Sequence, residues 1–211
     1  MTRLLFPHEI KPRPFETATA RAFRFGPRIS PNRAPYEFYP TPPEATRALL
    51  SVEQFDGSIW EPACGQGHIS KVLASAGHQV VSTDLMSYGY GEAGRDFLAE
   101  RKPLAKHIVT NPPYGRGLAD AFVKHALQLT ENNGGKVAML LAIQSLCHPL
   151  RHQLFTEYPP KTVYCLDRCE CWPEGKSGRV TPTLAAQRYC WVVWAPSHAG
   201  PTRLQWLRTS G

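Results

Sequence analysis

The chain has 211 residues and a formal net charge of +7, and its length fits one domain with attached tails. With 42% apolar and 10% aromatic residues it can form a hydrophobic core, which excludes disordered and collagen-like chains. No apolar run exceeds the seven residues of Val137 to Ile143, whereas a membrane span needs about 20. The first residues lack the apolar region of a secretory signal. We therefore expect a cytoplasmic protein with no membrane partner and with reduced cysteines.

The positive charge is concentrated at the two ends of the chain. Residues 1–35 have a net charge of +5, residues 36–195 are neutral, and the last sixteen residues add +2. The first segment is rich in proline and has no apolar periodicity, which predicts an extended basic arm. Such an arm would bind a polyanion or merely aid solubility. We divide the chain into this arm (1–35), one domain (36–195) and a C-terminal tail (196–211).

Short β-rich segments alternate with amphipathic helical segments through the domain. The expected strands are 58–64, 78–85, 106–114, 136–146, 161–168 and 188–195. The expected helices are 44–50, 69–76 and 118–129. This alternation predicts an α/β fold with a mostly parallel sheet.

In such sheets ligands bind beyond the carboxyl ends of the strands, and the first expected strand ends in an acidic, glycine-rich loop. Glu61 precedes Gly65 and Gly67, which let the backbone approach a ligand, and a helix follows at once. The second strand ends in Asp84, at a spacing close to that of a carboxylate that binds a ribose diol. A tight turn and a helix cap are the structural alternatives for these residues.

This loop does not suit a phosphate. It lacks the Lys-Ser/Thr pair of a P-loop and only approximates the dinucleotide fingerprint. Glu61 would repel a pyrophosphate but would accept hydrogen bonds from a cationic amino-acid group. The combination suits a nucleoside joined to an amino acid, as in S-adenosylmethionine.

The strand expected at 106–114 ends in Asn-Pro-Pro-Tyr, an order that turn chemistry seldom demands. The side-chain carbonyl of Asn111 and the backbone carbonyl of Pro112 offer two acceptors for the two hydrogens of an exocyclic amine or an amide. Pro113 stiffens the loop, and Tyr114 offers a ring on which an extruded base can stack. An Asn-Pro turn with a buried tyrosine is the structural alternative.

The strings YPTPPEATRALL, EPACGQGHIS, STDL, GRDFL and NPPYG follow one another over residues 39–115. Together they resemble the class I S-adenosylmethionine-dependent methyltransferases of the N6-adenine type, especially small stand-alone forms from bacteria and their phages. The resemblance covers roughly three quarters of the chain and implies a Rossmann-like fold. A mostly parallel, seven-stranded sheet flanked by helices is expected.

The resemblance also implies roles for individual residues. The expected S-adenosylmethionine-binding residues are Tyr39, Pro40, Thr41, Glu61, Ala63, Gly65, Gly67, Asp84, Leu85, Asp96 and Phe97. The first three would form the lip of the pocket, and the last two would contact the adenine of the cofactor. The expected catalytic residues are Asn111, Pro112, Pro113 and Tyr114. The expected target-binding residues are Tyr114, Arg116, Trp172, Lys176 and Arg179, and no metal is expected.

The expected reaction is methyl transfer to the N6 amine of adenine in DNA. Adenine in RNA and the side-chain amide of a protein glutamine remain alternative substrates, and a non-catalytic nucleic-acid-binding protein is a further alternative. The loop at 169–187 is the one sizeable stretch left for target recognition after the catalytic strand, so short or relaxed sequence specificity is expected.

Overall fold

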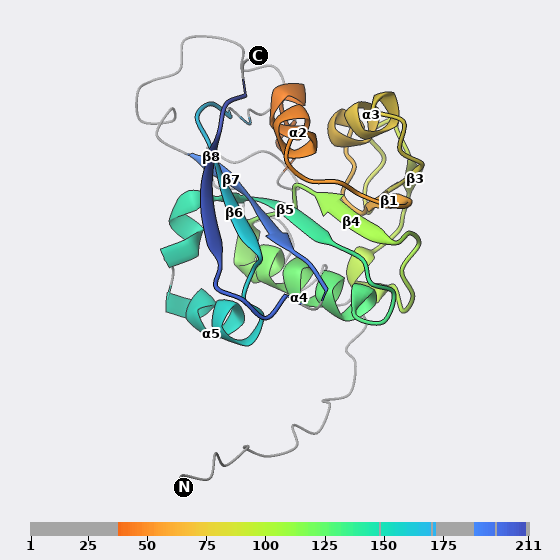
Figure 1. The fold of residues 1–211 in the computed structure, drawn as a ribbon. Coiled ribbons are helices and arrows are strands. Elements are labelled where there is room, and N and C mark those ends of the chain that lie inside the picture. The colour runs from red at the N-terminus through yellow and green to blue at the C-terminus, as the bar shows by residue number, and fades with distance from the viewer. Residues whose placement is uncertain (1–37, 148, 170, 172–187, 197, 210–211) are drawn as a thin grey trace, which may run out of the picture.

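The computed structural model describes residues 38–147, 149–169, 171, 188–196 and 198–209. One sheet runs through this part of the chain, with the strand order β3-β2-β1-β4-β5-β7-β6-β8 (Figure 1). Its strands are β1 (Ile59–Glu61), β2 (Val80–Asp84), β3 (Glu92–Ala93), β4 (His107–Thr110), β5 (Val137–Ala142), β6 (Thr162–Leu166), β7 (Tyr189–Trp194) and β8 (Arg203–Leu207). Within this sheet β7 runs antiparallel to β5 and β6, and the other neighbouring strands are parallel.

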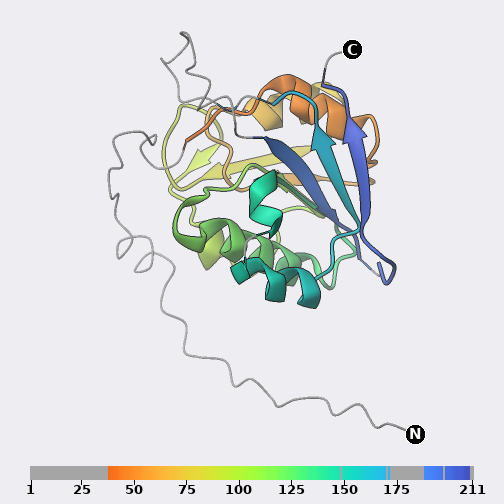
Figure 2. The same cartoon turned by 90° about the vertical axis from the view of Figure 1, so that its left-hand side faces the viewer.

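Helices cover both faces of the sheet, α2 and α3 on one and α4 and α5 on the other (Figures 1 and 2). They span α2 (Pro43–Leu50), α3 (His68–Ser75), α4 (Leu118–Thr130) and α5 (Pro149–Glu157). Three short turns of 3-10 helix are η2 (Phe97–Ala99), η3 (Gly115–Gly117) and η4 (Ile143–Cys147). The three predicted helices and the six predicted strands are confirmed, with ends shifted by a few residues. Helix α5 was not predicted, because its sequence has no continuous apolar face.

The sheet has eight strands where seven were expected, and one of them comes from the segment expected to be a tail. β8 pairs in parallel with β6, so residues 203–207 form an edge of the sheet. Two of its side chains are largely exposed, Leu204 at 53% and Trp206 at 76%. The alternation of polar and apolar residues in β8 is that of an edge strand with little burial, which a search for long apolar runs does not detect.

A hydrophobic core lies on each face of the sheet, because successive side chains of a strand point to opposite faces. Trp191 of β7 packs under α2 and donates a hydrogen bond from its indole nitrogen to the Ala45 carbonyl, at 2.8 Å. Trp60 of β1 packs in the core on the α4 side and donates to Thr83 Oγ1, at 2.9 Å. The first bond fixes α2 to the sheet, and the second joins β1 to β2 within it.

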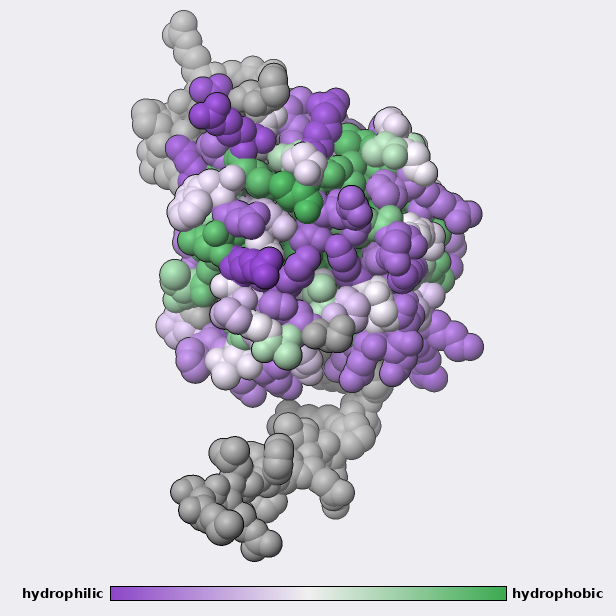
Figure 3. All heavy atoms as spheres, viewed as in Figure 1, coloured by the Kyte–Doolittle hydropathy of each residue, from purple (hydrophilic) through white to green (hydrophobic). Residues whose placement is uncertain are grey.

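No helix in the described part of the chain is long and apolar enough to cross a membrane. In the view of Figure 1, hydrophilic side chains predominate on the surface (Figure 3).

One buried acid joins distant elements. Glu53 is 2% exposed and accepts hydrogen bonds from Lys136 at 2.6 Å and from the Tyr164 hydroxyl at 2.8 Å, while Lys161 lies 3.3 Å away. Burial alone would raise the pKa of Glu53, but these hydrogen bonds and the two positive charges hold it below its ordinary value. Glu53 therefore ties the segment after α2 to β5 and β6.

We predict that Glu53→Gln lowers the free energy of unfolding by about 2 kcal/mol at pH 7, because two lysines lose a buried partner. A lowered folded-state pKa stabilises the fold above the ordinary pKa of the group, and this contribution is lost as the pH falls. The difference between the two proteins should therefore shrink below pH 4. Urea unfolding at several pH values measures it. Glu44→Gln, which removes an exposed i,i+3 pair with Arg47, is the matched control and should change stability little. An equal loss in both variants would contradict the account.

Candidate active site

Three neighbouring parallel strands, β2, β1 and β4, bring the predicted site residues to one edge of the sheet. Glu61 is the last residue of β1, Asp84 is the last of β2, and Asn111 follows β4 directly. The Arg95 backbone N–H donates to the Asp84 carbonyl at 3.0 Å, which holds Asp96 beside this edge as well. The acidic and amide groups selected from the sequence therefore converge.

The glycine loop between β1 and α3 is a tight turn. Gly65 and Gly67 have φ angles of +52° and +78°, a region that favours glycine. A Cβ atom at Gly65 would overlap the ring of Phe38, and one at Gly67 would overlap the ring of Tyr90. The Phe38 ring also stacks on Tyr88, with centroids 4.5 Å apart and planes 19° apart. These three aromatic residues cover the loop, and the sequence analysis missed them because no motif contains them.

Glu61 is almost fully buried and bound to the first turn of α3. Its Oε2 accepts the Ser70 backbone N–H at 2.8 Å and also the Ser70 hydroxyl. Burial raises the pKa of Glu61 to about 8, against the effect of the two Ser70 hydrogen bonds, and the charge of Asp84 adds to the increase. The carboxyl group is therefore mostly protonated at pH 7, and a nearby cation would favour its ionisation.

Asp84 is buried at the end of β2. Its Oδ2 accepts the Gly65 N–H and its Oδ1 accepts the Met86 N–H, both at 2.8 Å. Burial raises the pKa of Asp84, and these backbone hydrogen bonds oppose the increase. Each carboxylate oxygen has a further lone pair, so the group can still accept hydrogen bonds from a ligand. Leu85, the next residue, is 43% exposed.

The two carboxylate oxygens of Asp96 differ in their hydrogen bonding. Oδ1 accepts the Leu98 N–H at 3.0 Å, whereas Oδ2 is buried without a hydrogen-bond partner in the described part of the chain. Phe97 points into the core instead, 2% exposed, with its ring centroid 5.1 Å from Trp60 and 4.7 Å from Phe122. The expected contact of its side chain with the cofactor adenine stays a prediction. Asp96 caps the 3-10 turn η2 through its Oδ1, while the Phe97 side chain points into the core.

Asn111 is held through both ends of its amide. Nδ2 donates to the Tyr39 carbonyl at 3.2 Å and to Thr41 Oγ1 at 3.0 Å. Oδ1 accepts the Tyr114 hydroxyl at 2.5 Å, and that hydroxyl also lies 2.9 Å from the Leu140 carbonyl. Because Nδ2 has two hydrogens, both are used within the protein.

Tyr114 is partly buried, and its ring packs against both hydrophobic cores. The Tyr189 ring centroid lies 6.2 Å away. Burial raises the pKa of Tyr114 well above its ordinary value, so the hydroxyl stays protonated and can serve as a donor. The hydroxyl points toward Asn111 and Leu140, so stacking of a base on this residue would use an exposed part of the ring.

The remaining predicted residues divide into two groups. Pro112 is buried, while Tyr39, Pro40, Ala63 and Pro113 are half-buried around the same edge, and Arg116 lies in η3. Trp172, Lys176 and Arg179 lie outside the described residues, as do residues 1–35. Ser70 was not among the predicted residues, although its position three residues after Gly67 places it where a helix N-terminus meets the loop.

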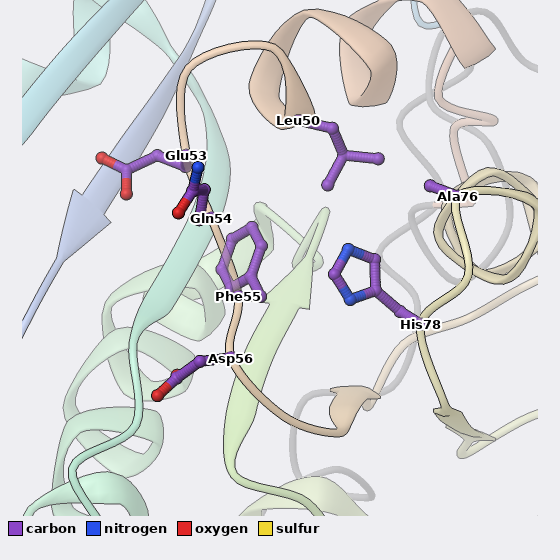
Figure 4. Close-up of a pocket in the computed structure, with 7 residues that line it drawn as sticks. All are labelled: Leu50, Glu53, Gln54, Phe55, Asp56, Ala76 and His78. Atoms are coloured by element: carbon purple, nitrogen blue, oxygen red, sulfur yellow. The ribbon is translucent and has the colours of Figure 1, made fainter.

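A cavity of about 410 Å³ lies at the other end of the strands (Figure 4). It is lined by Leu50, Glu53, Gln54, Phe55, Asp56, Ala76 and His78, from the segments that precede β1 and β2. The motif residues of the candidate site take no part in it. It is therefore separate from the site at the carboxyl ends of the strands.

No protein-family model and no curated protein matches the chain. It is similar to the structure of a protein from Listeria monocytogenes provisionally assigned as a class I S-adenosylmethionine-dependent methyltransferase, with a TM-score of 0.55 and 12% identity over 90% of this chain and 70% of that chain. A protein from Pyrococcus horikoshii provisionally assigned as an RNA methyltransferase has a TM-score of 0.50 and 11% identity, over 73% of this chain and 81% of that chain. A modification subunit of a provisionally assigned type I restriction enzyme from Vibrio vulnificus has a TM-score of 0.49 and 18% identity, and the match covers 88% of this chain and 48% of that chain. The first two likenesses and the strand order show that the chain has the Rossmann-like fold of class I methyltransferases.

Proposed function

We propose that the protein is an S-adenosylmethionine-dependent methyltransferase that acts on the N6 amine of adenine, in DNA before RNA. The observation that carries this proposal is the amide of Asn111. Both Nδ2 hydrogens are used by Tyr39 and Thr41, so Oδ1 is the part of the amide with capacity left for a ligand. An acceptor oxygen followed by the Pro112 carbonyl suits the two hydrogens of an exocyclic amine.

The residues around this amide fit the cofactor. Asp96 Oδ2, which is buried and has no hydrogen-bond partner among the described residues, could accept the adenine amine of S-adenosylmethionine, and Asp84 has free lone pairs for the ribose hydroxyls. Exposed Leu85 offers an apolar surface to the adenine ring. Glu61 would hold the ammonium group and become ionised by it. Burying an unpaired carboxylate is costly, which is why the free protein keeps Glu61 mostly protonated at pH 7, and a cationic ligand would stabilise the ionised form.

The chain's own residues would act by orientation and electrostatics. When bound, S-adenosylmethionine supplies a methyl group on a sulfonium centre. An aromatic amine has its lone pair delocalised into the ring, so Asn111 Oδ1 and the Pro112 carbonyl, by accepting its hydrogens, favour a tetrahedral nitrogen with a localised pair. The localised pair would be held ready to take up the methyl group, and the proton that the nitrogen then loses would pass to solvent. The Tyr114 ring would stabilise a base that has left its stack.

The same two acceptors would also fit the side-chain amide of glutamine. We favour DNA over RNA as the substrate because no feature of the sequence is specific for a ribose 2′-hydroxyl. The basic segment 1–35 supports a nucleic acid over a protein substrate through its charge of +5. A non-catalytic role in nucleic-acid binding would leave the Asn111 arrangement without use.

We predict that incubation with S-adenosylmethionine and duplex DNA, single-stranded DNA, RNA or a glutamine-containing peptide yields N6-methyladenine in a DNA pool. Digestion to nucleosides and mass detection measures the product, and amide methylation is measured in the peptide. Product in RNA alone or in the peptide alone would support the methyltransferase activity and contradict the proposed DNA substrate. Cofactor binding with no product in any pool would contradict the proposal.

Asn111→Ala should lower turnover by about 100-fold or more, because the variant loses an acceptor that acts on the reacting nitrogen. Its Kd for S-adenosylmethionine should stay within about threefold, a change below 1 kcal/mol. Asn132→Ala, in the exposed turn after α4, is the matched control and should retain full turnover. Undiminished turnover in Asn111→Ala would remove the loop from the mechanism.

The raised pKa of Glu61 gives a third prediction. Binding of a cationic cofactor at pH 7 should release close to one proton, because a carboxyl group with a pKa of about 8 is mostly protonated before binding. Isothermal titration calorimetry in two buffers of different ionisation enthalpy measures the released proton. Glu61→Gln should abolish the release and weaken binding by about 10-fold, a loss of about 1.4 kcal/mol. Unchanged proton release in this variant would show that the proton comes from another group.

The same shift affects stability. A carboxyl group whose folded-state pKa is raised above its ordinary value destabilises the fold progressively as the pH rises from about 4.5 through about 8. Glu61→Gln keeps an oxygen for the Ser70 hydrogen bonds and lacks the charge. The variant should therefore match the wild type at pH 4 and have a higher melting temperature at pH 9. Equal melting temperatures at pH 9 would contradict the assigned protonation state.

A further inference from the structure

The segment that leads into α2 makes contacts with the catalytic loop that its motif does not explain. Thr41 was expected at the lip of the cofactor pocket, yet it is 3% exposed and its Oγ1 accepts a hydrogen bond from Asn111 Nδ2 at 3.0 Å. The neighbouring Tyr39 carbonyl accepts from the same nitrogen at 3.2 Å. Asn111 lies about 70 residues further along the chain, so this contact is a feature of the folded protein alone.

We propose that Thr41 is a positioning residue that fixes the side-chain amide of Asn111, so that its oxygen is kept available for the target amine. The inference rests on the proposed function and deepens it, because it moves Thr41 from cofactor binding to orientation of the catalytic acceptor. The Tyr39 carbonyl and the Tyr114 hydroxyl complete the set of contacts.

The three contacts have different roles. A backbone carbonyl can only accept a hydrogen bond, so the Tyr39 carbonyl requires that the nitrogen of the Asn111 amide, and not its oxygen, faces this segment. The hydroxyls of Thr41 and Tyr114 can each donate or accept a hydrogen bond, so both are compatible with this orientation of the amide. Thr41 then takes the second hydrogen of Nδ2, and Tyr114 donates to Oδ1 at 2.5 Å. Without the Thr41 hydroxyl one part-buried N–H of Asn111 loses its partner, and the amide can rotate toward another acceptor.

The segment is stiff enough to serve as a support. Pro40, Pro42 and Pro43 restrict its backbone, and Pro43 begins α2. The Ala45 carbonyl in the first turn of this helix accepts the Trp191 indole N–H at 2.8 Å, which anchors the helix to β7. An acceptor held by a rigid segment is preorganised for the transition state, and no reorganisation is required when the substrate arrives.

The test compares Thr41→Val, which keeps the shape and removes the acceptor, with Thr41→Ser, which keeps the acceptor. The chain has four asparagines, Asn32, Asn111, Asn132 and Asn133, so labelling with [15N]asparagine gives a simple NMR spectrum. The Asn111 signals are identified by their loss in Asn111→Ala. In the wild type and in Thr41→Ser, both side-chain amide protons should exchange slowly with water. In Thr41→Val one of them should exchange faster, and a wild-type pattern there would overturn the proposal.

Kinetics give the second readout. Thr41→Val should lower kcat about 10- to 100-fold through misplacement of the acceptor, with KM for the nucleic acid and Kd for S-adenosylmethionine near wild-type values, and Thr41→Ser should restore kcat. A loss of cofactor affinity at unchanged kcat would return Thr41 to the cofactor pocket. Thermal unfolding of each variant shows that it is folded. The NMR pattern does not require turnover, so a wild-type protein that methylates nothing but keeps two protected Asn111 protons would refute the proposed function and leave the amide contact standing.

Discussion

The site depends on the parallel alignment of β2, β1 and β4. Because these strands are neighbours and run in one direction, their carboxyl ends meet at one edge, and three residues that lie far apart in the chain come together there. Each of these residues, Glu61, Asp84 and Asn111, lies at or directly after the end of a strand and not in a long loop. The backbone hydrogen bond from Arg95 to Asp84 places Asp96 beside the same edge.

The electrostatics of this edge favour a cation over a phosphate. The pKa values of Glu61, Asp84 and Asp96 are all raised, and burial is the largest cause for each of them. For Glu61 the negative charge of Asp84 adds to it. A phosphate would increase this repulsion, whereas a ligand with an ammonium and a sulfonium group would relieve it. Ionisation of these carboxyl groups is thus unfavourable in the free protein, and a cationic nucleoside would make it more favourable.

The sequence predicted those parts of the structure that rest on local pattern. β5 and β7 are continuous apolar runs buried on both faces, and the three predicted helices have clear apolar stripes or caps. β3 has two residues and β8 is mostly exposed, so neither produces a strong pattern. Helix α5 is held by tertiary contacts such as the ion pair of Arg151 with Asp120.

The site divides in the same way. Residues at strand ends were found because topology makes those positions significant, and the Asn-Pro-Pro-Tyr order is unusual enough to be noticed. Contacts between remote segments could not be found. Phe38 against Gly65 and Thr41 on Asn111 exist only once the chain has folded. The packing of the Phe97 ring against Trp60 and Phe122 is another such contact, which its position in the motif did not predict.

The proposed catalysis depends on acceptance of the target amine by Asn111 Oδ1. A crystal structure with the cofactor analogue sinefungin and a short adenine-containing DNA tests it most directly. We expect an adenine outside the base stack, with its N6 within about 3 Å of both Asn111 Oδ1 and the Pro112 carbonyl. A bound base whose amine lies away from these two oxygens, or an Asn111 amide that turns its nitrogen toward the base, would contradict it.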